Sequence, residues 1–368
     1  MRILFAGGGT GGHLYPGLAI ARAVQRIDPS ARPFFVGARR GIEREVLPSS
    51  GFPHILLDLH PFYRARPWEN WRTIVGFAKA WRDIGALAGE ELPAVVVGTG
   101  GYAAAAACGW GAAHKIPVVL QEQNSYPGIT ARLIARVAAE VYLGIGEASR
   151  WLKPKRGAWM VETGNPIDPP PSPRPSREAA RAAWQFPPNA RVLLIVGGSQ
   201  GAKALNETVS KWIERGVPDD LHIIWATGRG AFGEFKRLES SRVRVRPYLS
   251  PIADAYAAAN LALTRAGALT IAELCAWGIP ALLVPLPTAA ADHQSANARA
   301  LAASGAARQI PQRELTVDRI DREVRALLDD PSRLEAMARV TAARGRPDAA
   351  EQIAKRVLAL ARAPDKRA

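Results

Sequence analysis

Four glycine-rich turns constrain the fold of this chain more than any other feature of its sequence. They begin at Gly7, Gly98, Gly197 and Gly267, and each lies between an apolar run and a segment with helical spacing of apolar residues. A buried strand followed by a tight turn and a helix is the repeating unit of doubly wound α/β folds. Backbone N–H groups at such a turn favour an anion such as phosphate. The sequence therefore predicts an α/β protein that binds phosphorylated ligands.

A proline-rich segment divides the chain into two halves that repeat this pattern. Proline cannot continue a helix or a central strand, so residues 164–176 are predicted to form a semi-rigid linker. We expect two tandem Rossmann-like domains, at 1–163 and 177–346, with a last helix at 347–363 folding back onto the first. Because each domain carries two of the turns, their phosphorylated ligands would meet in a cleft between the two sheets.

The first glycine loop resembles a dinucleotide-binding fingerprint only in part. Gly7, Gly9 and Gly12 have the required spacing, but the next strand ends at Arg39 and Arg40 without the carboxylate that holds a ribose. This disfavours an NAD enzyme and leaves an NADP enzyme open. No Gly-Lys-Ser/Thr follows any of the loops, so the phosphate loop of nucleoside triphosphatases is absent.

The turn at Gly267 suits a nucleotide sugar. The predicted helix begins near Ala268, and Glu273 lies on the same helical face as Leu269, one turn further on. A carboxylate there can accept hydrogen bonds from two neighbouring hydroxyls while phosphate occupies the helix N-terminus. The alternative is that Gly267 only ends a loop and Glu273 is a solvated helix residue.

Composition narrows the class of partner without choosing one. The formal net charge is +15, which attracts nucleic acid, anionic lipid or a phosphorylated substrate, although an arginine-rich composition can also reflect genome bias. Nucleic acid lacks support because the basic residues are spread over many predicted helices. Cys108 and Cys275 lie in separate alanine-rich stretches, so we expect no disulfide, metal or cofactor. No apolar run is long enough to cross a bilayer and no signal segment is evident, which predicts a cytoplasmic location.

An aromatic helix near residue 75 has two interpretations. Arg64, Arg66, Arg72, Lys79 and Arg82 are interleaved with its apolar residues, a pattern typical of an amphipathic helix on an anionic membrane. The alternative is that the apolar stripe packs against the sheet of its own domain. The predicted membrane patch consists of Trp68, Trp71, Ile74, Val75 and Trp81.

Polar residues follow the strand predicted at residues 117–120. Gln123 and Asn124 come at the carboxyl end of that strand, where open α/β sheets bind their ligands. In a buried loop the same amides could instead satisfy backbone groups.

Six motifs in the same order resemble one known family. They are Gly-Gly-Thr-Gly-Gly-His at 8–13, Gly-Gly-Tyr at 100–102, Glu-Gln-Asn at 122–124, Gly-Gly-Ser-Gln-Gly-Ala at 197–202, Gly-Ala-Leu-Thr-Ile-Ala-Glu at 267–273, and Asp-His-Gln at 292–294 with Asn297. Together they resemble the bacterial peptidoglycan transferases that add N-acetylglucosamine to undecaprenyl-pyrophosphoryl-muramyl-pentapeptide. The resemblance implies an inverting enzyme with the two-domain GT-B fold, acting peripherally at the cytoplasmic face of the inner membrane.

The resemblance also implies roles for particular residues. Glu273 would hold the ribose hydroxyls of UDP-N-acetylglucosamine, with the uracil against Leu249 and the diphosphate near Ser199. The remaining donor-site residues would be Thr10, Gly11, Gly12, Asn124, Ala268, Leu269, Thr270, Ile271, Ala272, His293 and Gln294. The acceptor pyrophosphate would face Gly8, Gly9, Gly100, Gly101 and Tyr102.

Transfer requires a group that removes the proton of the acceptor hydroxyl. His13 is the candidate, because imidazole titrates near neutral pH and this residue follows a glycine loop. The alternative is that His13 only orients the loop or a substrate phosphate.

The sequence departs from the family pattern at three places. Gln121 replaces the usual histidine before Glu-Gln-Asn, Asp168 replaces an arginine, and residues 61–66 replace a Gly-Leu-Arg segment. The first two put acceptor and phosphate contacts in question, and the third indicates a rebuilt membrane face. Two alternatives remain, another GT-B glycosyltransferase acting on a lipid or natural-product acceptor, and a non-catalytic nucleotide-sugar or NADP-binding module.

Overall fold

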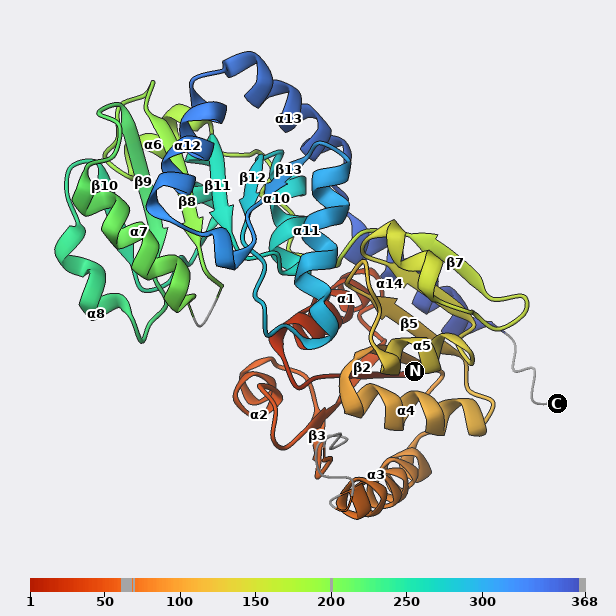
Figure 1. The fold of residues 1–368 in the computed structure, drawn as a ribbon. Coiled ribbons are helices and arrows are strands. Elements are labelled where there is room, and N and C mark those ends of the chain that lie inside the picture. Colours follow the sequence, from red (N-terminus) through yellow and green to blue (C-terminus); the bar gives the residue numbers. More distant parts are fainter. Residues whose placement is uncertain (61–67, 69, 199–200, 364–368) are drawn as a thin grey trace. The chain divides into compact units, whose positions relative to one another are not determined.

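The computed structural model describes residues 1–60, 68, 70–198 and 201–363, and the chain divides into two compact units. The first comprises Met1–Asp168 and the C-terminal segment from Asp348 onward, and the second comprises Pro169–Pro347. The chain passes from one unit to the other within its proline-rich segment. Figure 1 shows a parallel sheet flanked by helices in each unit. The predicted fold class, two tandem Rossmann-like α/β domains, is confirmed.

Within the described residues, the first unit contains one parallel sheet of seven strands in the order β3-β2-β1-β4-β5-β6-β7. The strands are β1 (Arg2–Gly7), β2 (Arg32–Ala38), β3 (His54–Leu57), β4 (Val95–Gly100), β5 (Val118–Glu122), β6 (Glu140–Leu143) and β7 (Trp159–Glu162). The α-helices are α1 (Gly11–Ile27), α2 (Glu43–Val46), α3 (Asn70–Glu90), α4 (Gly101–Ala113), α5 (Ile129–Ala135) and α14 (Ala349–Arg362).

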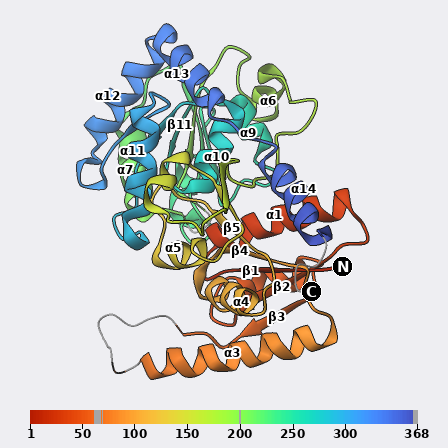
Figure 2. The same cartoon turned by 90° about the vertical axis from the view of Figure 1, so that its right-hand side faces the viewer.

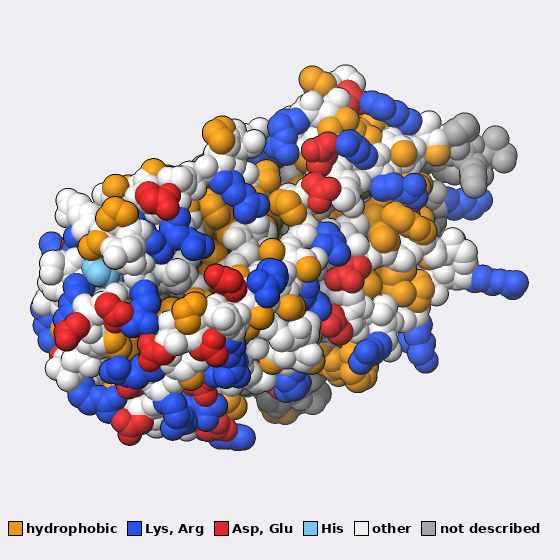
Figure 3. All heavy atoms as spheres, turned by 90° about the horizontal axis from the view of Figure 1, so that it is seen from above, with side chains coloured by type: hydrophobic (Ala, Val, Ile, Leu, Met, Phe, Trp, Pro, Cys, Tyr) orange, Lys and Arg blue, Asp and Glu red, His pale blue; other side chains and the backbone are white. Residues whose placement is uncertain are grey.

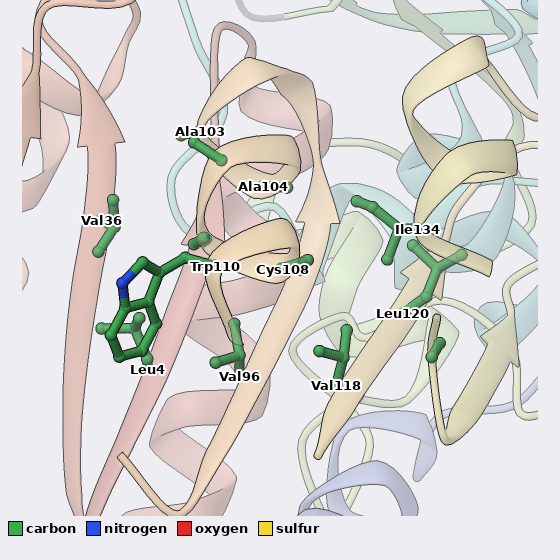
Figure 4. Packing of buried hydrophobic residues seen from close by; sticks show 14 of the residues in the cluster. Leu4, Val36, Val96, Ala103, Ala104, Cys108, Trp110, Val118, Leu120 and Ile134 are labelled. Atoms are coloured by element: carbon green, nitrogen blue, oxygen red, sulfur yellow. The ribbon is translucent and has the colours of Figure 1, made fainter. Parts of the chain in front are cut away.

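Helices cover both faces of this sheet because alternate strand residues are buried on opposite sides. Leu4 and Val96 pack with residues of α3, α4 and α5, whereas Ile3 and Phe5 pack with residues of α1 and α14. Figure 2 shows α1 and α14 on one side of the strands and α3 on the other. In the close view of Figure 4, Cys108 and Trp110 of α4 lie over Val96 and its neighbours, which places Cys108 in the hydrophobic core.

The C-terminal helix α14 packs on α1 in the first unit. Its apolar residues Ile353 and Val357 are fully buried in the same cluster as Leu18 and Val24. Two ion pairs flank this contact, from Arg356 to the buried carboxylate of Glu140 and from Arg362 to Asp28 at 2.6 Å.

The second unit contains a parallel sheet of six strands among its described residues, in the order β10-β9-β8-β11-β12-β13. The strands are β8 (Arg191–Val196), β9 (Leu221–Ala226), β10 (Val243–Arg246), β11 (Leu261–Thr264), β12 (Ala281–Leu283) and β13 (Ala307–Gln309). The α-helices are α6 (Arg177–Ala183), α7 (Lys203–Arg215), α8 (Phe232–Phe235), α9 (Ala253–Ala258), α10 (Ala268–Trp277), α11 (His293–Ala303), α12 (Val317–Leu328) and α13 (Pro331–Ala343).

Both sheets reverse their strand order at one point, and the predicted glycine turns lie at those points. In the first unit the reversal falls between β1 and β4, and in the second between β8 and β11. Open α/β sheets bind ligands at the carboxyl ends of the strands on either side of such a reversal. The turn predicted at Gly98 lies slightly later, because β4 continues to Gly100 and the chain turns at Gly100 and Gly101. The fold thus brings the four turns together as two pairs, one pair in each unit.

Candidate functional site

In the first unit, the turns after β1 and β4 touch each other. The N–H of Gly8 donates to the carbonyl of Gly100 at 3.2 Å. A Cβ at Gly101 would lie 2.3 Å from the Gly8 carbonyl oxygen, and Gly101 has a φ of +81°. Both facts require glycine, since an L side chain would clash and would be strained in this conformation. The predicted loops 8–12 and 100–101 therefore form one continuous backbone surface.

A buried carboxylate that the sequence did not indicate supports the first glycine loop. Glu43, at the start of α2, is fully buried, and its Oε1 accepts from the backbone N–H groups of Gly9 at 2.9 Å and Ala38 at 3.0 Å. Its other oxygen, Oε2, has no hydrogen-bond partner among the described residues. A Cβ at Gly8 would lie 1.6 Å from Oε1. Glycine at this position is therefore what lets Glu43 reach the loop.

His13 lies in the first turn of α1, half-buried beside the second loop. Its Nδ1 is 3.0 Å from the Gly8 carbonyl, and a Cβ at Gly100 would lie 2.6 Å from its ring. A carbonyl can only accept, so Nδ1 carries the proton and Nε2 is the basic nitrogen of the neutral ring. The hydroxyl of Thr99 donates to the His13 carbonyl at 2.7 Å, which ties the first turn of α1 to β4.

A cluster of amides lies beneath the loop after β5. Gln123 donates through Nε2 to the carbonyl of Thr99 at 2.8 Å and to Oε1 of Gln121 at 2.6 Å. Gln121 donates in turn to Asn165, whose side chain donates back to the Gln123 carbonyl. The alternative interpretation of Gln123 as a residue that satisfies buried groups is therefore correct. Gln121 replaces the family's histidine within this buried cluster.

Buried Glu122 and half-buried Asn124 form a second hydrogen-bonded pair in the same loop. The backbone N–H of Asn124 donates to Oε1 of Glu122 at 2.8 Å, and its side-chain amide donates to the same oxygen at 3.2 Å. Burial raises the pKa of Glu122 to about 7, against the lowering effect of those hydrogen bonds. Glu122 is thus a carboxyl group that can exchange a proton near neutral pH.

None of the helices that follow the four glycine turns has a side-chain N-cap, in contrast to three helices elsewhere in the second unit. Ser176, Thr316 and Asp330 cap α6, α12 and α13 through their side chains. The N-cap positions of α4 and α10 hold Gly100 and Gly267, which have no side chain to cap with. Alanine precedes α7, and Thr10 before α1 makes no side-chain cap bond. Among the described residues, no N-cap side chain therefore occupies these four helix starts, where an anion is favoured.

In the second unit, the turn between β11 and α10 is held by two buried polar side chains. Arg265 donates to the carbonyls of Val284 and Pro285 and to Gln312, and Asn297 of α11 donates to the carbonyl of Ala266 at 3.2 Å. The tight turn predicted at Gly267 does not depend on the backbone freedom of glycine, because Gly267 has an ordinary φ of −67°. A Cβ at Gly267 would meet only the Thr270 hydroxyl, at 3.8 Å. Glycine is thus not needed for the turn, and its effect is to leave space beside the helix start.

Glu273 lies on α10, and Leu249 packs against residues of the same helix. Leu249 packs with Tyr256, Ile271 and Leu274 in one buried cluster. Glu273 is half-buried on α10, and its Oε2 accepts a hydrogen bond of 2.7 Å from the hydroxyl of Tyr256 on α9. Ala268 and Ile271 are buried, whereas Leu269, Thr270 and Ala272 are half-buried. The side chain of Ile271 therefore belongs to the core, and only its backbone is available to a ligand.

His293 and Gln294 begin α11. Gln294 accepts from the N–H of Leu286 at 3.0 Å, and Nδ1 of His293 lies 2.6 Å from the Ala290 carbonyl. The preceding residues Ala291 and Asp292 have φ values of +53° and +54°, a left-handed conformation that is rare for residues other than glycine. Ser199, predicted at the diphosphate, lies outside the described residues.

The apolar face of α3 points to solvent. Trp71, Ile74 and Val75 are 59%, 71% and 57% exposed, and Trp68 just before the helix is 72% exposed. The helix packs on its own sheet with a different stripe, Gly76, Ala80, Ile84 and Ala88. Trp81 is the exception, since its ring lies against Gly109 of α4 and is 38% exposed. The alternative in which this aromatic stripe forms core is therefore wrong, apart from Trp81. Arg64, Arg66 and the rebuilt segment 61–66 lie outside the described residues.

Charged side chains of both signs are mixed on the surface of the protein. In the face shown in Figure 3, lysine and arginine side chains are interspersed with aspartate and glutamate. Among the residues that the structure describes, no group of three or more His, Cys, Asp or Glu side chains is placed to hold a metal ion. Asp168, which stands where the family pattern has an arginine, is largely exposed. Its Oδ1 lies 3.9 Å from Nη1 of Arg22.

Family models match both units of the chain. Residues 3–143 match the N-terminal domain of glycosyltransferase family 28, and residues 192–353 match its C-terminal domain. The two models match in the order of the family's domains, and each covers one sheet with its pair of glycine turns. The chain is therefore a glycosyltransferase of family 28.

The names of similar proteins are more specific than those of the family models. The chain is 38% identical to the UDP-N-acetylglucosamine–N-acetylmuramyl-(pentapeptide) pyrophosphoryl-undecaprenol N-acetylglucosamine transferase of Salinibacter ruber, over 98% of this chain and 96% of the relative. It is 36% identical to the transferase of the same name from Chlorobium limicola, over 98% and 100%. The crystal structure of MurG from Acinetobacter baumannii superposes with a TM-score of 0.76 at 27% identity, covering 97% of this chain and 99% of that one. The chain belongs to this family of peptidoglycan N-acetylglucosamine transferases.

Three residues that shape the site went unnoticed in the sequence. Glu43, Thr99 and Tyr256 act through hydrogen bonds to Gly9, His13 and Glu273, which are 34, 86 and 17 positions away along the chain. A lone glutamate close after a glycine-rich segment, or a lone tyrosine before a strand, carries no periodic signal. Only the strand order brings these partners together.

Proposed function

We propose that this protein transfers N-acetylglucosamine from UDP-N-acetylglucosamine to the muramyl sugar of undecaprenyl-pyrophosphoryl-N-acetylmuramyl-pentapeptide, which forms the lipid-linked disaccharide precursor of peptidoglycan. The observation that carries the proposal is the identity of 36–38% to transferases of that name over nearly the full length of both chains. Both units also retain paired glycine turns at the reversal of their strand order.

The donor would bind in the second unit. A diphosphate at the start of α10 would meet the positive end of the helix dipole, next to the space that Gly267 leaves. Glu273, one turn further along, would accept hydrogen bonds from the ribose hydroxyls, and Leu249 would pack against the uracil. His293 and Gln294 at the start of α11 would contact phosphate and sugar. With Nδ1 directed at the Ala290 carbonyl, His293 would reach phosphate with Nε2, which is a donor only when the ring is protonated.

The acceptor would bind on the continuous loop surface of the first unit. Gly8, Gly9, Gly100 and Gly101 have no side chains, so a pyrophosphate can approach the backbone closely, and the N–H groups of Gly8 and Gly9, which bond to Gly100 and Glu43, hold this surface in shape. Tyr102, 40% exposed in the first turn of α4, would flank it. Thr10, Gly11, Gly12 and Asn124 would contact the transferred sugar from this unit.

The transfer breaks the bond between the anomeric carbon and the UDP oxygen and forms a bond from that carbon to the acceptor hydroxyl oxygen. The hydroxyl proton must leave, and the basic Nε2 of His13 would take it; the contact of Nδ1 with the Gly8 carbonyl supports this role. UDP departs with the electron pair of the broken bond, and helix N-termini at the diphosphate stabilise this charge in the transition state.

The exposed face of α3 would hold the enzyme at an anionic membrane surface. Trp71, Ile74 and Val75 offer apolar side chains, and Arg72, Lys79 and Arg82 are exposed around them. Within the described part of the chain, no helix has the length and apolarity to span a bilayer. The enzyme would thus meet its lipid-linked acceptor as a peripheral protein at the cytoplasmic face of the membrane.

The test is the release of UDP when the purified protein receives UDP-N-acetylglucosamine and the prenyl-linked muramyl-pentapeptide. We expect turnover that requires both substrates and that falls strongly with UDP-glucose or UDP-galactose. Turnover with another nucleotide sugar, or with a natural-product acceptor in place of the lipid, would favour a different GT-B glycosyltransferase. UDP binding without any transfer would indicate a non-catalytic module.

A further inference from the structure

Tyr256 and Glu273 form a hydrogen-bonded pair of side chains in the candidate donor site. The Tyr256 hydroxyl lies 2.7 Å from Oε2 of Glu273, and the two residues come from adjacent helices, α9 and α10. Tyr256 is only 4% exposed, and its ring packs with Leu249, Ile271 and Leu274. Its ring centroid lies 5.9 Å from that of Trp277. The phenol is thus fixed by its surroundings before it meets the carboxylate.

The chemistry of the pair sets the direction of its hydrogen bond. A carboxylate can only accept, so the phenol must donate. Burial and the nearby charge of Glu273 raise the pKa of Tyr256 well above its usual value, which keeps the phenol protonated at neutral pH. The bond therefore persists across the pH range in which a transferase works.

A fixed phenol limits the motion of a mobile carboxylate. The terminal torsion of glutamate is broad, and Glu273 is only half-buried, so packing alone does not set the plane of its carboxylate. To accept from two adjacent ribose hydroxyls, that plane must be correct to within roughly 10–20°. A donor anchored in the core and aimed at one oxygen supplies this constraint.

We propose that Tyr256 is a positioning residue that holds the Glu273 carboxylate for both ribose hydroxyls of the donor, and thereby sets the preference for ribonucleotide over deoxyribonucleotide donors. This inference rests on the proposed function and assigns one determinant of its donor specificity. Leu249, which is proposed to pack against the uracil, belongs to the same buried cluster as Tyr256. The residues that support the uracil and the ribose-binding carboxylate are therefore packed together.

The decisive variant is Tyr256→Phe, which removes one oxygen atom and keeps the ring. Binding of UDP and of 2′-deoxy-UDP is measured by titration calorimetry, with KM and kcat for UDP-N-acetylglucosamine alongside. We expect the affinity for UDP to fall about tenfold, the loss typical of a hydrogen bond to a charged group, while the affinity for 2′-deoxy-UDP changes less than about twofold. KM for the donor should rise in parallel, with kcat within about twofold of wild type. An equal loss for both nucleotides, or an unchanged ratio, would overturn the proposal.

Tyr142→Phe is the matched control. Tyr142 is also a fully buried tyrosine that donates to a glutamate, Glu140, but it lies in the first unit. Its loss should affect stability and leave the ratio of UDP to 2′-deoxy-UDP affinity unchanged. A merely structural role of Tyr256 would give this same result.

Tyr256→Phe could unfold because Glu273 loses the hydroxyl that donates to it. A second variant keeps the proposal testable in that event. The double variant Tyr256→Phe with Glu273→Ala removes the carboxylate as well. It should have the same nucleotide ratio as Glu273→Ala alone, since Tyr256 acts only through Glu273. A further change in the ratio would mean that Tyr256 acts on the nucleotide independently, contrary to the proposal. If wild type itself neither bound UDP nor released it on transfer, the proposed function would fail rather than this inference.

Discussion

Nδ1 of His13 points at the carbonyl oxygen of Gly8, 3.0 Å away, and this single contact decides which ring nitrogen is basic. Because the carbonyl cannot donate, the neutral ring carries its proton on Nδ1. This hydrogen bond ties His13 to the loop, as expected if His13 has an orienting role. It also leaves Nε2 unprotonated in the neutral ring, which is the form that a general base needs. Orientation by the loop and catalysis by the ring are compatible.

His13→Gln should therefore lower kcat much more than it changes donor binding. Loss of a general base typically costs roughly 10²–10⁴ in rate. Steady-state kinetics of UDP release, with UDP affinity measured separately, checks this. A reduction of less than about fivefold would assign His13 to orientation only. His114→Gln is the control, since that histidine stacks on Trp110 at the far end of α4.

Glu43→Ala should destabilise the first glycine loop. The change removes the acceptor for the N–H groups of Gly9 and Ala38, and each buried group left without a partner costs about 1–3 kcal/mol. We expect the free energy of unfolding in urea to fall by about 2–4 kcal/mol and KM for the lipid acceptor to rise. Glu43→Gln keeps an accepting oxygen and should lose less. Glu45→Ala, two residues away and exposed, is the control. Equal stability of Glu43→Ala and Glu45→Ala would refute the structural role.

Glu122 should make folding stability depend on pH. Burial raises its pKa from 4.5 to about 7 in the folded protein, so folding favours the protonated form. The associated stability is fully present below pH 4.5 and is lost as the pH rises through about 7. Glu122→Gln abolishes this loss. Between pH 5 and pH 8 the variant should gain roughly 2–3 kcal/mol relative to wild type in urea unfolding. Parallel curves for the two proteins over that range would contradict the assignment.

The exposed face of α3 should bind anionic vesicles. Trp71→Ser with Ile74→Ser removes two side chains that are more than half exposed, so the unfolding temperature should stay within about 2 °C of wild type. Cosedimentation with vesicles that contain phosphatidylglycerol should fall at least about tenfold, because each large apolar side chain contributes about 1.5–3 kcal/mol when buried. Leu92→Ser, an exposed apolar residue beyond the helix, is the control. Unchanged cosedimentation would exclude this face as the docking surface.

The fold class and the four turns could be predicted because they depend on local patterns. Apolar runs, glycine loops and helical spacing are read within windows of about 10–20 residues. The short strands β6, β7 and β13 were missed, since a segment of three or four residues is too short for its pattern to separate a strand from a helix. The strand order could not be derived locally either. It alone explains why Gly8 meets Gly100 and why Gln123 reaches Thr99.

The site residues also divide into those that a local pattern predicts and those that it does not. His13, Glu273 and Leu249 follow motifs whose spacing is visible in the sequence, and roles were predicted for them. The residues that orient them are single side chains from distant segments, as with Glu43 and Tyr256. Gly267 is a different case, because its φ of −67° is open to any residue and what the missing side chain leaves is space beside the start of α10.

The proposed function requires above all that UDP binds beside α10 through Glu273. The direct measurement is the dissociation constant of UDP for Glu273→Ala by titration calorimetry. If the carboxylate accepts from the two ribose hydroxyls, the affinity should fall by about 2–3 kcal/mol, or roughly 30- to 150-fold. Glu335→Ala, at an exposed position on α13, should leave it unchanged. A folded Glu273→Ala protein that binds UDP as tightly as wild type would contradict the placement of the donor, and with it the central claim.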